Sequence, residues 1–364
     1  MGRERLSDGR AERSRAWTVG VALALAWVLL YVWALRTGPT GSYSLGDALR
    51  GTLAALGLGE PLESREQTIL RLRALRVLAA LGVGASLALS GGLLQGLFRN
   101  VLASPGVLGV TAGSSLGAAL AIASIGGFGP GLSMEGGGAL APVVVTLAAL
   151  AGALLVLVPL GFVASAGGRV SVPTLLLAGM AMNALCSALL AALQSLTLGD
   201  FEVARALFAW AFGTLDDRAA WQVALPWLAL VVGVLAIPLV ARELDLLATG
   251  DEDASALGVR VPRVRTQVLV LSALLAAAAV SVAGQILFVG LLAPHAVRLV
   301  TGSAHARLLP LSALAGGVLL AGADCLQRTW LPDVHAAPGV LMSLLGAPFF
   351  LYILARQREE LSSW

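Results

Sequence analysis

A serine in a glycine-rich setting is the first candidate for chemistry in this sequence. Gly113-Ser114-Ser115-Leu116-Gly117 matches the G-x-S-x-G pattern of serine hydrolases, in which a sharp turn exposes the serine oxygen to a histidine base. In those enzymes the pattern follows a strand, but here it lies within an apolar stretch rich in small residues, which favours helix packing. Helix packing is therefore the preferred interpretation, and an intramembrane hydrolase that uses Ser115 with His295 is the alternative.

Other residues that could carry chemistry are sparse. All 24 basic residues are arginine, so the chain has no lysine for a nucleotide-binding P-loop or for a Schiff base. Cys186 and Cys325 lie far apart in apolar stretches and are expected to be small buried side chains. His295, His305 and His335 are scattered without zinc-ligand spacing. No catalytic residue, metal site or bound cofactor is therefore expected.

The composition indicates which elements must position any site. Of the 364 residues, 58% are hydrophobic and 12% are charged, whereas a soluble domain carries about 25% charged residues. This much apolar sequence is enough for roughly ten membrane-spanning helices of about 20 residues each. The expected fold class is all-α, a polytopic membrane protein with about ten transmembrane helices. The net charge of +3 comes from arginines at membrane edges and does not indicate nucleic-acid binding.

Ten apolar segments are the candidate spans. The eighth is too short to cross a bilayer alone and is expected to lie at a slant or partly inside the bundle. More loop arginines fall on the side of the N-terminus than on the other side, so both termini are expected in the cytoplasm. The first span lacks a following cleavage site and is expected to be retained. The spans are 17–35, 76–98, 105–125, 139–165, 173–197, 219–241, 265–287, 288–300, 308–326 and 338–355.

These spans predict a simple domain organisation. Residues 1–16 form a basic cytoplasmic segment, 17–356 form the membrane domain, with a cytoplasmic polar loop at 241–265, and 357–364 form a cytoplasmic tail. Residues 89–114 and 282–303 resemble each other in sequence and would run in opposite directions across the membrane. This similarity indicates either an inverted repeat, which is typical of transporters, or a shared bias toward small residues.

The polar loop contains the pattern of a short capped helix over residues 250–258. Asp251 is placed to accept the first free N–H groups, and acidic residues in a first turn suit the helix dipole. Gly258 can adopt the left-handed conformation that ends a helix. Ala254 and Leu257 would form a small apolar face of the kind a docking helix needs. The alternative is an ordinary solvated loop.

Several motifs together resemble a known family. Arg99-Asn100-Val-Leu-Ala-Ser-Pro105-Gly-Val-Leu-Gly109 is similar to the signature R-N-P-L-A-x-P-x-x-L-G, with Val101 in place of its first proline. Over about residues 65 to 355, the chain resembles the membrane-spanning permease subunits of ABC importers for iron–siderophores, haem and vitamin B12. Further segments that carry the resemblance are 73–76, 82–95, 175–183, 210–213, 250–258, 288–295 and 346–350.

The resemblance implies a set of partners. Family members form a dimer of ten-helix permeases with a pathway along the two-fold axis, and a second copy of this chain is expected. Two ATP-binding subunits would dock on the cytoplasmic loops, and an extracytoplasmic substrate-binding protein would dock outside. ATP and Mg²⁺ would then belong to the partner subunit, which agrees with the missing lysine. The resemblance implies an iron(III)–siderophore substrate in the cytoplasmic (inner) membrane, with haem and vitamin B12 as alternatives.

The resemblance also implies roles for individual residues. For Arg73, Arg76 and Arg328, which are expected on the outer side of the membrane, the alternative role is to anchor their helices at the membrane interface. A secondary transporter is a remaining alternative, but it predicts buried acids in mid-span, and only Asp324, which could pair with Arg328 at i,i+4, approaches this. Coupling to the ATP-binding subunit is implied for Asp251, Glu252, Ala254, Leu257 and Gly258; docking of the binding protein for Arg73, Arg76 and Arg328; and pathway lining for Asn183, Gln194 and Ser343.

Overall fold

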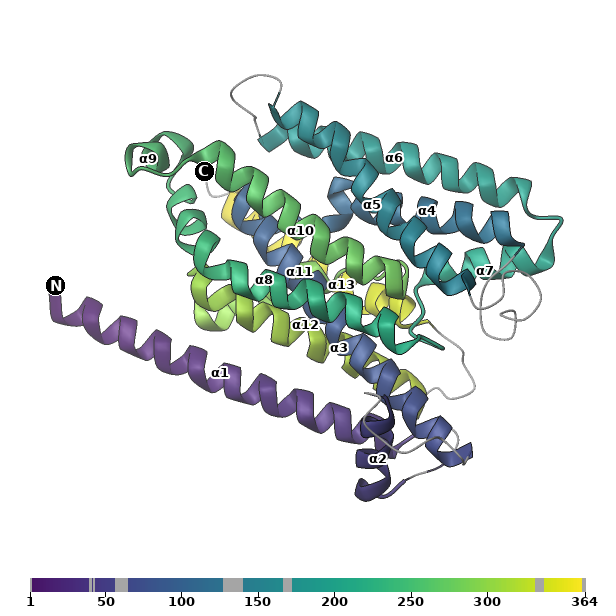
Figure 1. The fold of residues 1–364 in the computed structure, drawn as a ribbon. Helices are drawn as coiled ribbons and strands as arrows, with labels where there is room; N and C mark the ends of the chain where they lie inside the picture. The colour runs from purple at the N-terminus through teal and green to yellow at the C-terminus, as the bar shows by residue number, and fades with distance from the viewer. Residues whose placement is uncertain are drawn as a thin grey trace.

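The described part of the chain is helical. The computed structural model describes residues 2–38, 41, 43–55, 65–126, 140–165, 172–330 and 337–361, and no strand occurs among them. Figure 1 shows these helices gathered into one bundle, with α1 along one edge and α6 along the opposite edge. The helices are α1 Gly2–Arg36, α2 Leu45–Ala55, α3 Arg65–Phe98, η1 Pro105–Leu108, α4 Val110–Ile125, α5 Ala141–Ser165, α6 Val172–Leu196, α7 Phe201–Phe212, α8 Ala220–Leu247, α9 Asp251–Ala256, α10 Val261–Ala283, α11 Val289–Thr301, α12 His305–Trp330 and α13 Pro338–Leu361.

Each of the ten expected spans coincides with a helix, and the all-α expectation is confirmed. Among the described residues, six helices are long and apolar enough to cross a membrane by themselves, and α4, α5, α11 and α13 contain shorter apolar stretches. The number of spans in the bilayer stays a prediction. The 13 residues of α11 correspond to a length of about 20 Å and most are buried against other helices, as expected for a segment partly inside the bundle.

Helix α3 forms the centre of the bundle. In its most apolar window, 94% of the residues are buried, against 17% for α6 and 11% for α1. Glycines allow α3 to lie so close to its neighbours. A Cβ added to Gly84 would overlap the carbonyl of Gly316 in α12, and one added to Gly91 would overlap the carbonyl of Gly290 in α11. Small residues thus bring α3 into backbone contact with two neighbours, the packing typical of membrane helices.

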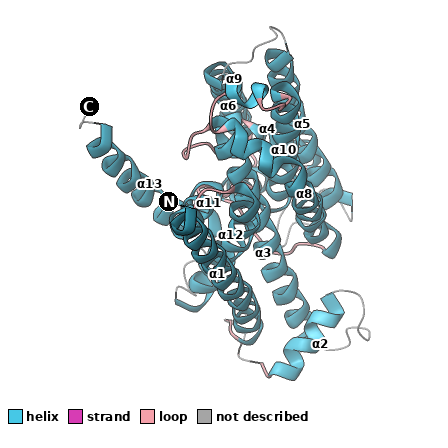
Figure 2. Ribbon diagram, turned by 90° about the vertical axis from the view of Figure 1, so that its left-hand side faces the viewer, coloured by secondary structure: helices cyan, strands magenta, loops and turns pink. Residues whose placement is uncertain are grey.

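Helix α1 lies on the outside of the bundle, against α12 (Figures 1 and 2). The indole N–H of Trp27 donates to the carbonyl of Leu314 at 2.7 Å, and its ring meets Trp227 edge-on at 5.7 Å between centroids. The helix is continuous across the boundary expected between residues 16 and 17. At the other end of the chain, α13 runs past residue 356, so no break separates the expected tail from the last span.

Two described helices, α2 and α7, were not expected, and the expected span 105–125 is divided into η1 and α4. Helix α2 follows α1 and packs on α3, and η1 precedes α4. Helix α7 begins after Asp200, whose carboxylate accepts from the N–H groups of Glu202 and Val203 at 3.1 and 3.2 Å. This is the standard N-cap arrangement, and the sequence carried the signal for it.

Helices extend into both ends of the expected polar loop 241–265. Helix α8 continues from Ala241 to Leu247, and α10 begins at Val261, because charged residues can prolong a helix beyond the membrane edge. Residues 248–260, which include α9, are the part of 241–265 that lies between α8 and α10. Cys186 and Cys325 are both buried and free, as expected. Whether 89–114 and 282–303 form an inverted repeat stays a prediction.

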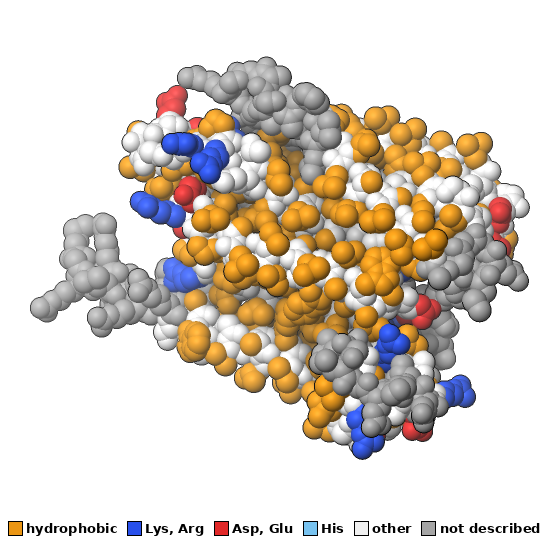
Figure 3. Space-filling view, viewed as in Figure 1, with side chains coloured by type: hydrophobic (Ala, Val, Ile, Leu, Met, Phe, Trp, Pro, Cys, Tyr) orange, Lys and Arg blue, Asp and Glu red, His pale blue; other side chains and the backbone are white. Residues whose placement is uncertain are grey.

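The surface separates apolar from charged side chains. In Figure 3 hydrophobic side chains cover the broad middle of the visible face, and blue and red side chains gather near α9 and near the α2 end of the bundle. Exposed leucines and valines of α8, such as Leu235 and Leu239, belong to the apolar area. An apolar band between two charged edges is the pattern of a helical bundle in a bilayer.

Candidate coupling and docking sites

The short helix expected in the polar loop is present as α9. Its last turn ends in a complete Schellman motif, in which Gly258 N–H donates to Ser255 and Val259 N–H donates to Ala254, both at 3.0 Å. Gly258 has φ +88°, a conformation that glycine adopts without strain. The expected end of the helix at Gly258 is confirmed.

The start of α9 differs from the expectation. Gly250 occupies the N-cap position with φ +126°, and no side chain caps the helix. The carboxylate of Asp251 instead pairs with Arg99 at 2.8 Å and with Arg265 at 2.6 Å. The prediction that Asp251 caps its own helix was therefore wrong, because two arginines from other elements attract the carboxylate more strongly than neutral N–H groups do.

The expected apolar face of α9 is divided. Ala254 is fully buried in the core, whereas Leu257 is 63% exposed, so these two residues do not share a docking surface. Glu252 and Gly258 are exposed, as Leu257 is. A partner that approaches α9 can therefore contact Glu252, Leu257 and Gly258, while Ala254 anchors the helix to the bundle.

Arg73 is buried near the other end of the bundle. It is 6% exposed, and its guanidinium donates to the carbonyls of Leu35 and Gly41, both at 3.0 Å. The same group lies over the ring of Tyr43, with its carbon 5.0 Å from the ring centroid. Arg73 therefore fixes the connection between α1 and α2.

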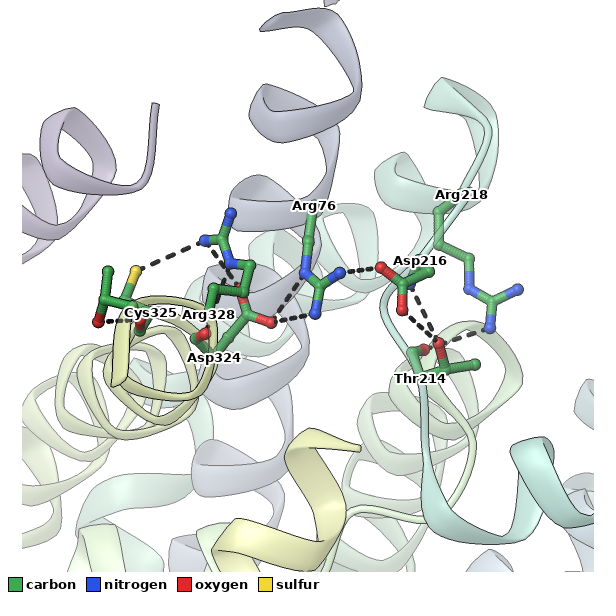
Figure 4. A network of polar contacts seen from close by, with 8 residues as sticks. Arg76, Thr214, Asp216, Arg218, Asp324, Cys325 and Arg328 are labelled. Carbon is green, nitrogen blue, oxygen red and sulfur yellow. Dashed lines mark hydrogen bonds and ion pairs between the residues drawn. The ribbon is translucent and has the colours of Figure 1, made fainter. Parts of the chain in front are cut away.

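Arg76 and Arg328 belong to one ion-pair network, which we call the outer arginine network and which consists of Arg76, Asp216, Asp324 and Arg328. Asp324 is completely buried and pairs with Arg76 at 2.8 Å and with Arg328 at 3.0 Å. Arg76 also pairs with the half-exposed Asp216. Figure 4 shows these side chains converging from α3, α12 and the connection between α7 and α8. The expected i,i+4 pair of Asp324 with Arg328 is confirmed.

A further buried arginine lies beside this network (Figure 4). Arg218 donates to the carbonyl of Thr214 at 3.2 Å and lies over the ring of Trp210 at 5.9 Å. Burial lowers the pKa of Arg218 to about 10, and the charge of Asp217 opposes this shift. Because that pKa is still far above neutral pH, Arg218 stays charged and adds to the positive potential of this end.

The candidate pathway residues lie on two helices, α6 and α13. Asn183 and Gln194 are half-buried on α6, eleven positions apart, and Ser343 is half-buried on α13. The Ser343 hydroxyl donates a hydrogen bond to the carbonyl of Gly339 at 2.8 Å, within its own helix. The backbone of Asn183 lies against Gly109, where an added Cβ would be 3.1 Å from the Asn183 nitrogen.

The serine considered for hydrolysis has a different partner. The amide of Gln285 donates to the Ser115 hydroxyl at 2.9 Å, and the His295 ring packs edge-on against Phe349 at 6.0 Å. Ser115 lies within α4, with no strand before it among the described residues. This arrangement is that of packed helices and does not resemble a nucleophile with its base. The third histidine, His335, lies outside the described residues.

Comparison with known proteins identifies the family. The model of the FecCD transport family matches residues 16–356. The chain belongs to this family. The FecCD transport family consists of transport permeases, so the chain is a multi-pass membrane permease, not a hydrolase.

Individual relatives agree with the family match. The hemin transport system permease protein HmuU of Yersinia pestis is 40% identical over 80% of this chain and 84% of its own length. The cobalamin import system permease protein BtuC of Halobacterium salinarum is 40% identical over 84% of this chain and 78% of its own. The Fe(3+)-citrate import system permease protein YfmE of Bacillus subtilis is 36% identical over 91% and 93%.

A solved structure is also similar to this FecCD-family chain. It is an inward-facing conformation of a metal-chelate type ABC transporter, with a TM-score of 0.76 and 29% sequence identity over 92% of this chain and 98% of that one. The similarity thus extends over nearly the whole bundle, including the helices that position α9 and the outer arginine network.

Sequence reasoning missed three members of these sites. Arg99 was part of the family signature without a role, Arg265 was one of several arginines at the membrane edge, and Asp216 had no distinguishing pattern. Their partners lie more than ten positions away in the chain. No local spacing reports such a pair.

Proposed function

We propose that this FecCD-family permease is the membrane-spanning subunit of an ATP-driven importer that moves an iron(III)–siderophore or a related metal chelate across the cytoplasmic membrane. The observation that carries the proposal is the family match over residues 16–356. The relatives named for Fe(3+)-citrate, hemin and cobalamin support the class of substrate, because each of these is a bulky metal chelate. Haem and cobalamin are the alternative substrates.

ATP hydrolysis is assigned to a separate subunit, two of which serve each complex. The chain has no lysine and therefore no P-loop of the usual form. Glu252, Leu257 and Gly258 give the partner an exposed surface, Asp251 and Ala254 hold the helix that carries it, and Figure 1 shows α9 at the end of the bundle where both chain ends lie. Both termini and α9 are then cytoplasmic.

Replacing Leu257 by aspartate is expected to weaken docking of the ATP-binding subunit by about tenfold or more. Fully burying a leucine side chain is worth about 1.5–3 kcal/mol, and a carboxylate buried in its place would lack a partner. The measurement is the fraction of ATP-binding subunit that co-purifies with the permease in detergent. Thr249→Asp adds the same charge just before α9 and should co-purify normally; equal loss in both variants would contradict the role of Leu257.

Docking of a substrate-binding protein is proposed for Arg73, Arg76 and Arg328. These arginines already have internal partners. Docking would require acidic groups of the binding protein to compete with Asp216 and Asp324 for Arg76 and Arg328, and with two backbone carbonyls for the buried Arg73. The half-exposed Asp216 is the partner most easily displaced. Arginine–carboxylate pairs would orient the docked protein and accelerate its association.

Such docking should depend on salt. Raising the salt concentration from about 0.1 M to about 1 M shortens the Debye length from about 10 Å to about 3 Å, which weakens attraction between exposed charges. The dissociation constant of the binding protein should rise by about tenfold or more over this range, measured on permease in nanodiscs. An affinity that does not change with salt would indicate that the arginines only anchor the bundle at the interface.

A second copy of the permease is proposed to cover part of the bundle edge. Helix α6 has 17% of its apolar window buried, and Leu177, Met180 and Leu185 are exposed on it. Lipid covers the remaining apolar surface, including α1. In a dimer with a pathway between the copies, Asn183 and Gln194 on α6 would lie near that pathway, with Ser343 contributed by α13.

The substrate class can be tested directly. Vesicles containing the permease, its ATP-binding subunit and its binding protein should accumulate a radiolabelled ferric siderophore. ATP has to be supplied on the side of the membrane where α9 lies. Ferric citrate, haem and cobalamin are the comparison substrates. Uptake of haem or cobalamin alone would select the alternative substrates, and uptake of none of the four would contradict the proposal.

A further inference from the structure

The carboxylate of Asp251 joins three separate elements of the cytoplasmic end. Its two oxygens pair with different arginines, one with Arg99 just after α3 and the other with Arg265 within α10. Arg265 is largely buried, whereas Asp251 and Arg99 are partly exposed. We call these three residues the Asp251 clamp. Helix α9 has only six residues, so the clamp and the buried Ala254 are its main attachments to the bundle.

The backbone at Arg99 is strained in the conformation that forms the clamp. Arg99 has φ +51°, and α3 ends there in a Schellman motif, with Arg99 N–H donating to Gly96 at 3.3 Å and Asn100 N–H donating to Gln95 at 3.2 Å. Glycine is the usual residue at this position, and a non-glycine residue there is strained. An arginine in a glycine position indicates that its side chain is needed.

The elements joined by the clamp lead into the bundle in two directions. Helix α3 runs without a break from Phe98, next to Arg99, back to Arg76 in the outer arginine network, a distance of about 33 Å. In the other direction, the chain after Arg99 enters η1, whose residues pack against α6 at Gly179. A displacement of α9 would therefore reach both the centre of the bundle and the helix that carries Asn183.

We propose that Arg99, Asp251 and Arg265 are positioning residues that transmit movement between α9 and the helices α3 and α10. This proposal rests on the proposed function, in which the ATP-binding subunit contacts α9. In it, Asp251 does not touch the ATP-binding subunit; it makes the short helix move together with α3 and α10. Without the clamp, α9 can still bind the ATP-binding subunit. The loops on either side of α9 then absorb its displacement, which does not reach α3 and α10.

The alternative is an ordinary surface ion pair. Exposed pairs contribute little to stability and would have no further role. The two interpretations differ in what Arg99→Gly does. Glycine relieves the strain at φ +51°, so the fold should be as stable as before or more stable, whereas the link between α9 and α3 is removed.

The test uses the complete complex in vesicles, with ferric siderophore uptake and ATP hydrolysis measured together. Arg99→Gly and Asp251→Asn should each lower the number of chelates moved per ATP by at least about tenfold, which corresponds to about 1.4 kcal/mol of coupling. The ATP-binding subunit should still co-purify, and the melting temperature of Arg99→Gly should not fall. Asp253→Asn removes an equal charge from an exposed position of α9 outside the clamp and should keep the normal ratio.

Two results would overturn the proposal. One is a normal transport ratio in Arg99→Gly, and the other is a loss in Arg99→Gly that is matched by a fall in its melting temperature. Failure of the proposed function itself is distinguishable, because the unmodified complex would then show no ATP-dependent uptake.

Discussion

Replacing Asp324 by asparagine is expected to destabilise the permease by about 3–5 kcal/mol. Asp324 is completely buried and compensates the charges of Arg76 and Arg328. Its removal leaves two arginine cations with one half-exposed carboxylate, Asp216, between them. The predicted loss is large because an uncompensated buried charge costs far more than the ion pair itself contributes.

The measurement is unfolding of the purified permease by SDS in mixed micelles. Asp216→Asn is the matched control, since it removes the same charge from the same network at a half-exposed position, and it should cost under about 1 kcal/mol. If Asp324→Asn unfolds at the same SDS fraction as the original protein, the outer arginine network does not hold the bundle together.

Replacing Gly91 by valine is expected to prevent the close crossing of α3 and α11. A Cβ at Gly91 would overlap the carbonyl oxygen of Gly290, and no side-chain rotation can remove a clash with backbone. Overpacking typically costs about 1–3 kcal/mol, and this change should reach or exceed the upper value, because α3 is the central helix. The yield of monodisperse protein and its melting temperature measure the effect.

The neighbouring glycine provides the control. A Cβ at Gly92 would lie 3.1 Å from a terminal carbon of the Leu309 side chain, which can shift by a few tenths of an ångström. Gly92→Ala should therefore change the melting temperature little. Equal damage from Gly91→Val and Gly92→Ala would show that the crossing of α3 and α11 is not the critical contact.

The helices could be predicted from the sequence because their signals are local. Apolar runs of sufficient length identified ten helical segments, and glycine at position 258 marked the end of α9. Helix ends were less accurate, as in α8, where Arg242, Glu243 and Asp245 continue the helix beyond the apolar run. Hydropathy reports the membrane edge, and a helix does not have to end there.

The long-range pairs could not be predicted in this way. Asp324 and Arg328 are four positions apart on one helix, and that pair was foreseen. Arg76 and Asp324 are 248 positions apart, so their contact depends on how α3 and α12 cross. Similarly, Asp251 fits the pattern of a helix cap, but its two arginine partners come from elements whose positions the local sequence does not specify.

We expect transport by this permease to depend on a separate ATP-binding subunit. The most direct measurement compares ferric siderophore accumulation by vesicles containing the permease alone with vesicles that also contain the ATP-binding subunit and the binding protein. We predict that the permease alone neither hydrolyses ATP nor concentrates the chelate, and that the complete set does both. Concentration of the chelate against a gradient by the permease alone would contradict the account.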